Sequence, residues 1–482
     1  MKLALIGLIL MQVLATCAPD YSRPDAALPP VYRDQPPAAA TQASLGDLGW
    51  WQLFKDPQLL ALLRTAVAQN QDINVAAQRV QEAQAQLTIT AANLYPNVNA
   101  VFSAQYSQTN GQRSLITPKS TFSPNGLLTL SYEFDFFGKY RSATAAARAQ
   151  SLQATYAQET VMAAVVASTA SLYFQILELD NELAIARANL AVRRQSLDLV
   201  RARLYGGVGT LQDVRQAEQL VAQAQAAIPQ IQRATAQAEN ALSVLLGGYP
   251  APVPRGLPLR AQVAMPLVPA AGLPSELLER RPDIRASEES LIAANAQIGV
   301  ARSLLFPQIT LQAAAGAGTV QTAYLSLGQG YISILPQLVQ QIFNAGAARA
   351  AVGQAQAAKE AAVLSYIQSV HQGFSDVSDA LVDYDKDREI TVASAENEFA
   401  SLDSARLANL RFEGGVTSYL EVLDSQTRAF SAEVQLSQAE LSERLDIVDL
   451  YQALGGGWQP ETAAVTTPAP VQPPSSSPVP SP

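Results

Sequence analysis

Only a few side chains of this chain have the type and spacing that chemistry at a site requires. Glu421 and Asp424 are three residues apart in a stretch that reads as the start of a helix, so both carboxylates would lie on one face. Carboxylates grouped in this way attract cations, but an acidic first turn also simply counters the helix dipole. Asp213 is the one acid at the equivalent place in the first half of the chain. The residues alone leave both interpretations of the pair open.

The single cysteine and the single histidine of the chain do not indicate a second candidate site. The chain has one cysteine, Cys17, so no intrachain disulfide and no Cys-based metal site can form. The single histidine, His371, falls within an expected helix without a cysteine, a second histidine or an acid at ligand spacing. We interpret His371 as a structural residue and expect no metal site.

Sequence motifs of catalysis are also absent. The chain contains no P-loop, HExxH or GxSxG pattern. Gly207-Val208-Gly209 could suggest a phosphate loop, but it lies between two expected helices instead of following a strand, and the third glycine of the dinucleotide pattern is missing. We interpret it as the turn of a helical hairpin, and we expect neither an enzyme nor a bound cofactor.

The overall composition excludes further classes of partner. The net charge is −9 and no block of Lys and Arg stands out, which argues against nucleic acid. After residue 17 no uninterrupted apolar run approaches the ~18–20 residues of a transmembrane helix. If the protein spans a membrane, it does so with strands.

The N-terminus is typical of a targeting segment. Lys2 precedes a short apolar core at 3–14, and Leu14-Ala15-Thr16-Cys17 resembles a bacterial lipoprotein signal that is cleaved before a lipid-bearing cysteine. The alternative is an ordinary secretory signal with an incidental cysteine. We predict a signal peptide at 1–16 and a lipid-anchored, extended tether at 17–44, and Ala18 after the cysteine suits passage to the outer membrane.

Two stretches about 211 residues apart share one layout. The first runs from Asp72-Ile73 to Tyr95-Pro96, and the second from Asp283-Ile284 to Phe306-Pro307. Both place apolar residues at seven-residue steps, as in a coiled-coil seam, and both stop at an aromatic–Pro step. After each stop the period changes from seven to two, so a helix gives way to strands twice. We predict an internal duplication, with repeats at 45–248 and 275–458, a Pro-rich linker at 249–274 and a disordered Pro/Ser-rich tail at 459–482.

Each half contains two expected strands, which makes four per chain. Apolar and polar residues alternate over 98–106 and 128–136, with a loop at 110–125 between them. The second half repeats this over 308–317 and, more weakly, 331–338. Strands of about ten residues have the length that a tilted membrane strand requires.

Each half also contains a short, a long and a medium helix. The first half places them at 59–94 (with a break near Asn70-Gln71), 142–204 and 211–246; the second half places them at 283–305, 346–412 and 418–454. A long helix of this size spans roughly 95 Å at ~1.5 Å per residue. The short seam helix and the medium helix together match the long one, so we predict that they lie end to end along it, with the hairpin at one tip and the strands at the other.

Four strands per chain require an oligomer. Even the smallest closed barrel has about eight strands, and a bilayer does not tolerate open sheet edges. We therefore expect a mixed fold, mostly helical with membrane strands, in which several chains close a pore and their helices continue it as a tube.

The residues that follow the linker resemble a known family. Leu-Pro-Ser-Glu-Leu-Leu-Glu-Arg-Arg-Pro-Asp-Ile at 273–284 is similar to the hallmark of the lipoprotein branch, of the NodT/OprM type, of the TolC-type outer-membrane efflux factors. The resemblance covers essentially Trp50 to Trp458. Ala294–Ala301 and Phe306-Pro307 also match the family's pattern at the expected positions. The two hairpin tips are similar to the family's Arg-aromatic-x-x-Gly tip; they are Arg203-Leu204-Tyr205-Gly206-Gly207 and Arg411-Phe412-Glu413-Gly414-Gly415.

This resemblance implies an architecture and a function. It implies a homotrimer with a 12-stranded outer-membrane β-barrel, in contact with outer-membrane lipid and continued by a periplasmic α-helical barrel. The assembly would be a passive exit duct for drugs or other toxic small molecules, delivered by an inner-membrane pump, of the RND type, through a periplasmic adaptor protein. A duct paired with an ATP-driven protein exporter, and a coiled coil without conductance, are the alternatives. The lipoprotein hallmark favours small-molecule efflux, and strands of membrane length argue against the coiled coil.

The resemblance also implies residue roles. Glu421 and Asp424 would ring the constricted periplasmic entrance, whereas Asp213 would lie on an outer or intermolecular surface. The residues implied to contact the adaptor are Arg203, Leu204, Gly206, Gly207, Arg411, Phe412, Gly414 and Gly415. Arg281-Pro282-Asp283 has an explanation without a ligand, because Pro suits the first helical turn and Asp283 complements the dipole. We interpret this motif as a helix start whose arginines anchor the linker.

Overall fold

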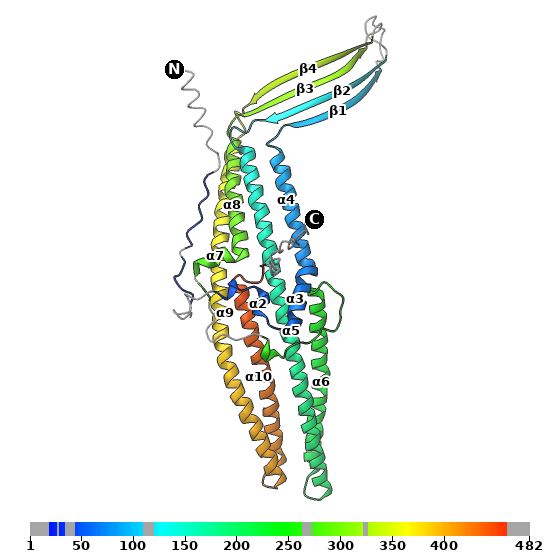
Figure 1. Cartoon of the computed structure of the whole chain (residues 1–482), viewed down its shortest axis with the longest axis vertical. Coiled ribbons are helices and arrows are strands. Elements are labelled where there is room, and N and C mark those ends of the chain that lie inside the picture. The colour runs from blue at the N-terminus through cyan, green and yellow to red at the C-terminus, as the bar shows by residue number, and fades with distance from the viewer. Residues whose placement is uncertain are drawn as a thin grey trace, which may run out of the picture.

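A long helical rod with a four-stranded sheet at one end forms the described part of the chain (Figure 1). The predicted signal peptide, Cys17 and the tail from residue 460 lie outside this part. The computed structural model describes residues 19–26, 28–33, 44–108, 120–262, 271–272, 274–321 and 326–459.

Two long helices set the length of the rod. α5 (Lys139–Tyr205) and α9 (Ala347–Glu413) each contain 67 residues, which corresponds to about 100 Å at ~1.5 Å per residue. α5 contains one stretch that is apolar and long enough to cross a membrane by length and composition, but 56% of that stretch is buried inside the chain. We therefore assign this stretch to the core of the rod.

The shorter helices lie end to end along the long ones, as predicted (Figure 1). α4 (Gln71–Ala92) and α6 (Leu211–Leu245) follow α5, and α8 (Pro282–Ser303) and α10 (Tyr419–Ala453) follow α9. α8 and α10 also pack against α5, so they join the two halves. The remaining short helices are α2 (Trp50–Leu53), α3 (Pro57–Gln69), α7 (Leu277–Arg280) and the 3-10 turns η1 (Leu45–Asp47), η2 (Leu259–Ala261) and η3 (Pro274–Glu276).

The break near Asn70 is confirmed and has a clear cause. Asn70 ends α3 and caps α4, because its Oδ1 accepts hydrogen bonds from the backbone N–H of Asp72 and Ile73 at 2.8 and 3.1 Å. Its Nδ2 also donates to the carbonyl of Leu245 at 2.9 Å, which ties this break to the end of α6.

The Arg-Arg-Pro-Asp motif starts α8, as predicted. Pro282 is the first helical residue and Asp283 lies in the first turn. The guanidinium of Arg281 pairs with Asp283 at 2.7 Å and with Asp376 of α9 at 2.8 Å, and it also donates to the carbonyl of Ala453 in α10. The motif therefore fixes the start of α8 to both helices of the second hairpin.

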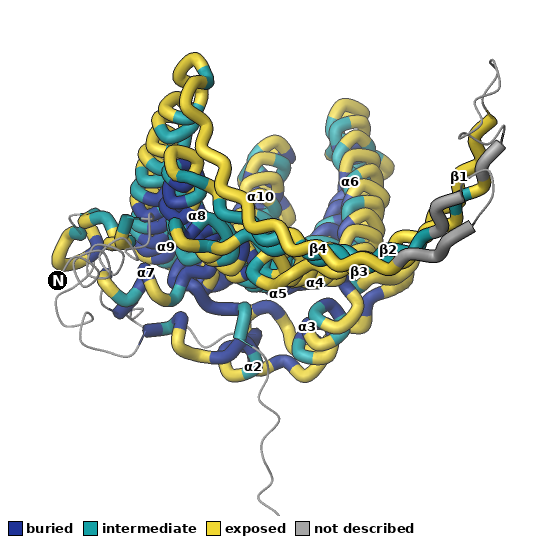
Figure 2. The backbone as a smooth tube through the Cα atoms, turned by 90° about the horizontal axis from the view of Figure 1, so that it is seen from above, coloured by how far each residue is buried: buried dark blue, intermediate teal, exposed yellow. Residues whose placement is uncertain are grey.

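The four strands form one antiparallel sheet in the order β1-β2-β3-β4. The strands are β1 (Asn97–Gln108), β2 (Ser120–Glu133), β3 (Gln308–Gln321) and β4 (Ser326–Val339). The two halves join through β2 and β3, so β1 and β4 are the edges. No described helix packs over the sheet, which extends away from the rod (Figures 1 and 2). Large apolar side chains such as Phe102 and Ile332 are exposed on it.

The predicted bounds of the strands were partly wrong. β2 does not reach 136, because the carboxylate of Asp135 accepts hydrogen bonds from the backbone N–H of Tyr140 and Arg141 and thereby caps α5. At its other end β2 includes Pro124, which falls in the predicted loop at 110–125. The ladder to β3 begins only at Asn125, so Pro124 pairs with β1 alone and its missing N–H is tolerated. β3 and β4 are likewise longer than predicted.

The N-terminal tether is extended but docked. Arg23 pairs with Glu288 and Glu279 at 2.7 Å each, and Asn295 of α8 donates to the carbonyl of Pro19 at 2.8 Å. Tyr32 is buried, with its ring 5.4 Å from that of Phe374. The described tether residues therefore follow α8 and enter the core instead of standing free.

Candidate functional site at the hairpin tips

The two helical hairpins turn at the end of the rod opposite the sheet (Figure 1). Their turns have the same backbone geometry. Gly207 and Gly415 take left-handed φ values of 76° and 73°, and the amide of Val208 donates to the carbonyl of Arg203 at 3.0 Å, as that of Val416 does to Arg411 at 2.8 Å. This is the Schellman motif, which needs glycine at the left-handed position. The interpretation of Gly207-Val208-Gly209 as a hairpin turn is confirmed.

Arg203 connects the first tip to the second. Its Nη1 donates to the carbonyl of Phe412 at 2.9 Å, and its guanidinium carbon lies 4.6 Å from the centre of the Phe412 ring. The Phe412 ring in turn lies 5.4 Å from that of Tyr419, and burial raises the pKa of Tyr419 to about 12. Both hairpins contribute to the apolar cluster below, which consists of Leu197, Val200, Val214, Ala217, Ala408, Phe412, Tyr419 and Val422. The tips are therefore packed as one unit.

Glu421 and Asp424 lie on the first two turns of α10, and each is paired with an arginine. Glu421 is 3.0 Å from Arg411 and also accepts a hydrogen bond from the hydroxyl of Thr417. Asp424 is 2.8 Å from Arg428. Both carboxylates remain largely accessible, with 41% and 59% of their side chains exposed. The predicted acidic patch is thus a patch of exposed ion pairs.

Asp213 has a different environment in the first hairpin. It forms a capping box with Thr210: the carboxylate accepts from the Thr210 amide at 3.1 Å, and the Thr210 hydroxyl accepts from the Asp213 amide at 3.2 Å. The neighbouring Glu218 pairs with Arg201 and Arg215 instead. Asp213 therefore stabilises the start of α6.

Sequence reasoning overlooked the partners of these acids. Arg428 could have been found, because it lies four residues after Asp424, the spacing of a helical ion pair. Thr210-x-x-Asp213 also fits a capping-box pattern. The contact of Arg203 with Phe412 joins residues 209 positions apart and has no local signal.

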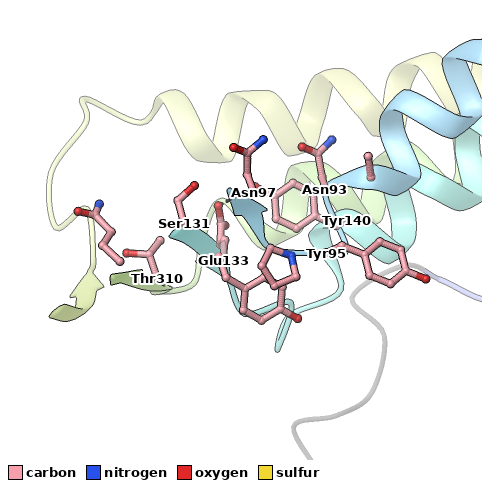
Figure 3. Close-up of a pocket in the computed structure, with 11 residues that line it drawn as sticks. Asn93, Tyr95, Asn97, Ser131, Glu133, Tyr140 and Thr310 are labelled. Carbon is pink, nitrogen blue, oxygen red and sulfur yellow. Dashed lines mark hydrogen bonds between the residues drawn. The ribbon is translucent and has the colours of Figure 1, made fainter. Parts of the chain in front are cut away.

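A polar cavity of about 460 Å³ lies at the other end of the rod, where the sheet meets the helices (Figure 3). Asn97 of β1, Ser131 and Glu133 of β2 and Thr310 of β3 line it, because alternate residues of neighbouring strands share one face. Glu133 accepts from the hydroxyl of Tyr140 at 2.7 Å and pairs with Lys139. The lining residues contain no cysteine or histidine, and the wall of this cavity is polar.

Both halves of the chain match the outer membrane efflux protein family, over residues 62–248 and 273–456. The chain is 36% identical to the probable efflux pump outer membrane protein TtgC of Pseudomonas putida, across 96% of this chain and 97% of that protein. It is 32% identical to the probable outer membrane lipoprotein SilC of Salmonella typhimurium, across 95% and 99%.

Solved structures agree with this match. The open state of the MtrE outer membrane channel of Neisseria gonorrhoeae superposes with a TM-score of 0.83 at 30% identity, covering 92% of this chain and 99% of that one. The names of these proteins describe an efflux pump outer membrane protein, an outer membrane lipoprotein and an outer membrane channel, and none of them describes an enzyme, which confirms the predicted resemblance to the NodT/OprM type. This chain is an outer-membrane efflux channel and belongs to the outer membrane efflux protein family.

Proposed function

We propose that three copies of this chain form a passive exit duct through the outer membrane. The observation that carries this proposal is the bare four-stranded sheet, whose edges β1 and β4 have no partner strand among the described residues. Open edges are costly in lipid, and four strands are too few to close a barrel. In a threefold ring β1 of one copy pairs with β4 of the next, which gives a closed barrel of twelve strands.

The helices of the three copies would continue this barrel as a tube through the periplasm. α9 lies at one side of each rod, and α4 and α6 lie at the other, so the rods have two unlike sides (Figure 1). Leu364 and Phe399 of α9 and Ile89 of α4 are exposed apolar side chains on these helices. Head-to-tail packing of unlike sides closes a ring when the rotation between copies is a whole fraction of a turn, as in the proposed threefold barrel.

The hairpin tips are the proposed docking surface for a periplasmic adaptor, which connects the duct to an inner-membrane pump of the RND type. Tyr205, Val208, Val416 and Leu420 are all exposed at the tips. Clustered apolar side chains in water are typical of a protein contact. The contact would include the turns with Arg203, Leu204, Gly206, Gly207, Arg411, Gly414 and Gly415. Phe412, which was also predicted to contact the adaptor, is buried, so it would support Arg203 from below instead of touching the adaptor.

Glu421 and Asp424 are proposed to line the narrow entrance of the duct at these tips. Their accessible carboxylates, each paired with an arginine, support this placement. The entrance of a trimer would then carry a ring of both charges. Removing only the acids or only the arginines should change its charge in opposite directions.

The substrates are proposed to be drugs, solvents or other toxic small molecules. Relatives from Pseudomonas putida carry the names antibiotic efflux pump outer membrane protein ArpC and toluene efflux pump outer membrane protein TtgC. The pump would supply the energy and select the cargo, so the duct needs no catalytic group.

A lipid on Cys17 is proposed to anchor the chain in the outer membrane. The likeness to the lipoprotein SilC supports this, and the docked tether holds Pro19, two residues later, against α8. Cys17→Ser should abolish labelling by a fatty-acid analogue, whereas part of the protein should still reach the outer membrane through its strands. Unchanged labelling of the variant would contradict the assignment.

The oligomer is tested by native mass measurement of the full-length protein in detergent, followed by single-channel recording in a bilayer. We expect three copies of the mature chain and a conducting pore. A stable monomer that keeps its strand content would refute the shared barrel, and a trimer without conductance would favour a structural coiled coil.

A further inference from the structure

The internal duplication of the chain extends to the register of its strands. Asn97 lies opposite Ser131 in the hairpin of β1 and β2, and Gln308 lies opposite Val339 in the hairpin of β3 and β4. Counted along the chain, Gln308 comes 211 residues after Asn97, and Val339 comes 208 residues after Ser131. Each residue of β1 therefore has a counterpart in β3, and each residue of β2 has one in β4.

The turns on either side of the strands keep the same two offsets. Tyr95 and Phe306, which are 211 residues apart, follow α4 and α8, and their amides donate to carbonyls three residues back at 3.0 and 3.1 Å. Gly138 and Gly346, which are 208 residues apart, are the left-handed N-caps of α5 and α9. The correspondence thus runs from the end of each short helix, through two strands, to the start of each long helix.

Inside the chain the two halves meet at one seam, the ladder between β2 and β3. It pairs residues 125–133 of β2 with residues 310–318 of β3. The pairing continues past the end of β2, because the amide of Phe134 donates to the carbonyl of Ile309 at 2.8 Å. The outer edges β1 and β4 have no such partner among the described strands, and their described side chains are exposed (Figure 2).

We propose that β4 of one copy pairs with β1 of the next in the register of this internal seam. This register presupposes the proposed trimer, in which β4 takes the place of β2 and the next copy's β1 takes the place of β3. The two offsets then pair residues 333–341 of one copy with residues 99–107 of the next, in antiparallel order. Val339 should lie opposite Val101 of the next copy, and Leu338 opposite its Phe102.

The faces of the two edge strands support this register. Residues that lie opposite one another across the four strands share a face of the sheet, as do Val98, Leu130, Ala313 and Ile334. Because side chains alternate along a strand, Phe102 and Leu338 lie on that same face, and both are exposed. The proposed register brings these two apolar side chains together. A shift by one residue would instead join this face of one copy to the opposite face of the next.

The register also gives the exposed linker after β4 a partner. Ile342 is 95% exposed, and its counterpart at the internal seam is Phe134. The amide of Ile342 would donate to the carbonyl of Val98 in the next copy, as Phe134 does inside the chain. In the same linker Ala345 takes a φ of 51°, the only positive value at a non-glycine residue in the described part of the chain. Strained residues persist where their surroundings fix them, and the second copy would supply such surroundings.

Val339 and Val101 are the most suitable pair for a disulfide test. They correspond to Ser131 and Gln312 of the internal seam, three residues from the hydrogen-bonded position at Phe134. Hydrogen-bonded and non-hydrogen-bonded pairs alternate along an antiparallel ladder, so this is a non-hydrogen-bonded pair with Cα atoms about 4.5 Å apart. That distance lies within the ~4.4–6.8 Å that a disulfide spans.

The experiment uses the full-length protein in outer membranes, with Cys17→Ser to remove the single native thiol. Val339→Cys/Val101→Cys is oxidised with copper phenanthroline and run on a denaturing gel without reductant. We expect nearly complete loss of free thiols and covalent trimers, because a closed ring forms the bond at each of its seams. Reductant should return the monomer.

Three further double variants serve as controls. Ser131→Cys/Gln312→Cys has the same geometry inside one chain, so it should lose its thiols to the same extent but still run as a monomer. Val339→Cys/Asn99→Cys and Val339→Cys/Ser103→Cys are displaced by two residues on the same face. Diagonal neighbours of this kind lie about 7–8 Å apart, so these variants should keep most of their thiols.

The outcomes separate the register from the trimer. Cross-linking to Asn99→Cys or Ser103→Cys in preference to Val101→Cys, in a protein that is trimeric by native mass, would overturn the register alone. A native trimer without a cross-link in any pair would overturn the pairing of β4 with β1. A monomer by native mass would overturn the trimer and this register with it. If Val339→Cys/Val101→Cys does not assemble, Gln337→Cys/Ser103→Cys, the next non-hydrogen-bonded pair of the same register, is oxidised in its place.

Discussion

The two hairpin tips share a backbone but use their acids differently. In the first hairpin Asp213 is committed to a capping box with Thr210. In the second, Ser418 makes no side-chain cap, and Glu421 pairs instead with Arg411 at the end of α9. A duplicated fold can therefore hold one copy of a turn with its own cap and leave the charges of the other copy exposed on the surface.

We expect the largest difference in stability between the two tips at Phe412 and its counterpart Leu204, which lie just before the turns. Phe412 is buried between Arg203 and Tyr419, whereas its counterpart Leu204 is only half-buried. Phe412→Ala should cost about 3–5 kcal/mol, because it empties a packed site and removes the surface on which Arg203 lies. Leu204→Ala should cost clearly less. Thermal unfolding of the trimer measures both, and equal losses would mean that the two tips are not packed unequally.

The stability of the second hairpin should also depend on pH, through Asp446 in the middle of α10. The pKa of Asp446 is raised from 3.8 to about 7, so the folded chain binds more protons than the unfolded chain between these values. Stability should therefore fall as pH rises from about 4 to about 7, by on the order of 2–4 kcal/mol per chain without divalent cations. Asp446→Asn should flatten this slope. A melting profile in EDTA that keeps the same pH dependence in the variant would contradict this assignment.

The difference in N-terminal capping between α6 and α10 predicts a smaller change in stability. Thr210→Ala should cost about 1 kcal/mol, because the amide of Asp213 loses its acceptor. Ser418→Ala should be close to neutral, since Ser418 forms no side-chain cap. The matched pair is compared by thermal unfolding, and a larger loss for Ser418→Ala than for Thr210→Ala would invert the comparison.

Much of the helical architecture could be predicted because its signals are local. The seven-residue steps that end at Tyr95-Pro96 and Phe306-Pro307 mark the two changes from helix to strand, and glycines mark both hairpin turns. Strand ends were harder to predict. The alternation that continues to Phe136 is overridden by Asp135, which caps α5, and Pro124 is tolerated only because the β2–β3 ladder begins after it.

The residues of the candidate site could be predicted from the sequence, but their contacts could not. The acids at 421 and 424 and the arginines of both tips are visible in the sequence, but the pairing of Glu421 with Arg411 depends on how the α9–α10 turn folds. The contact of Arg203 with Phe412, and the meeting of Asp446 with Asp383, require the packing of helices that are distant in the sequence. Long-range packing is thus the part that residue patterns did not supply.

The central claim is that the second hairpin, and not the first, lines the entrance of the duct. Reversal potentials of single trimeric channels under a salt gradient test it most directly. Glu421→Ala/Asp424→Ala should shift selectivity towards anions, because it leaves Arg411 and Arg428 unpaired, and Arg411→Ala/Arg428→Ala should shift it towards cations. Asp213→Ala should leave the potential unchanged. Identical potentials in the wild type and in both second-hairpin variants, or a shift with Asp213→Ala alone, would contradict the account.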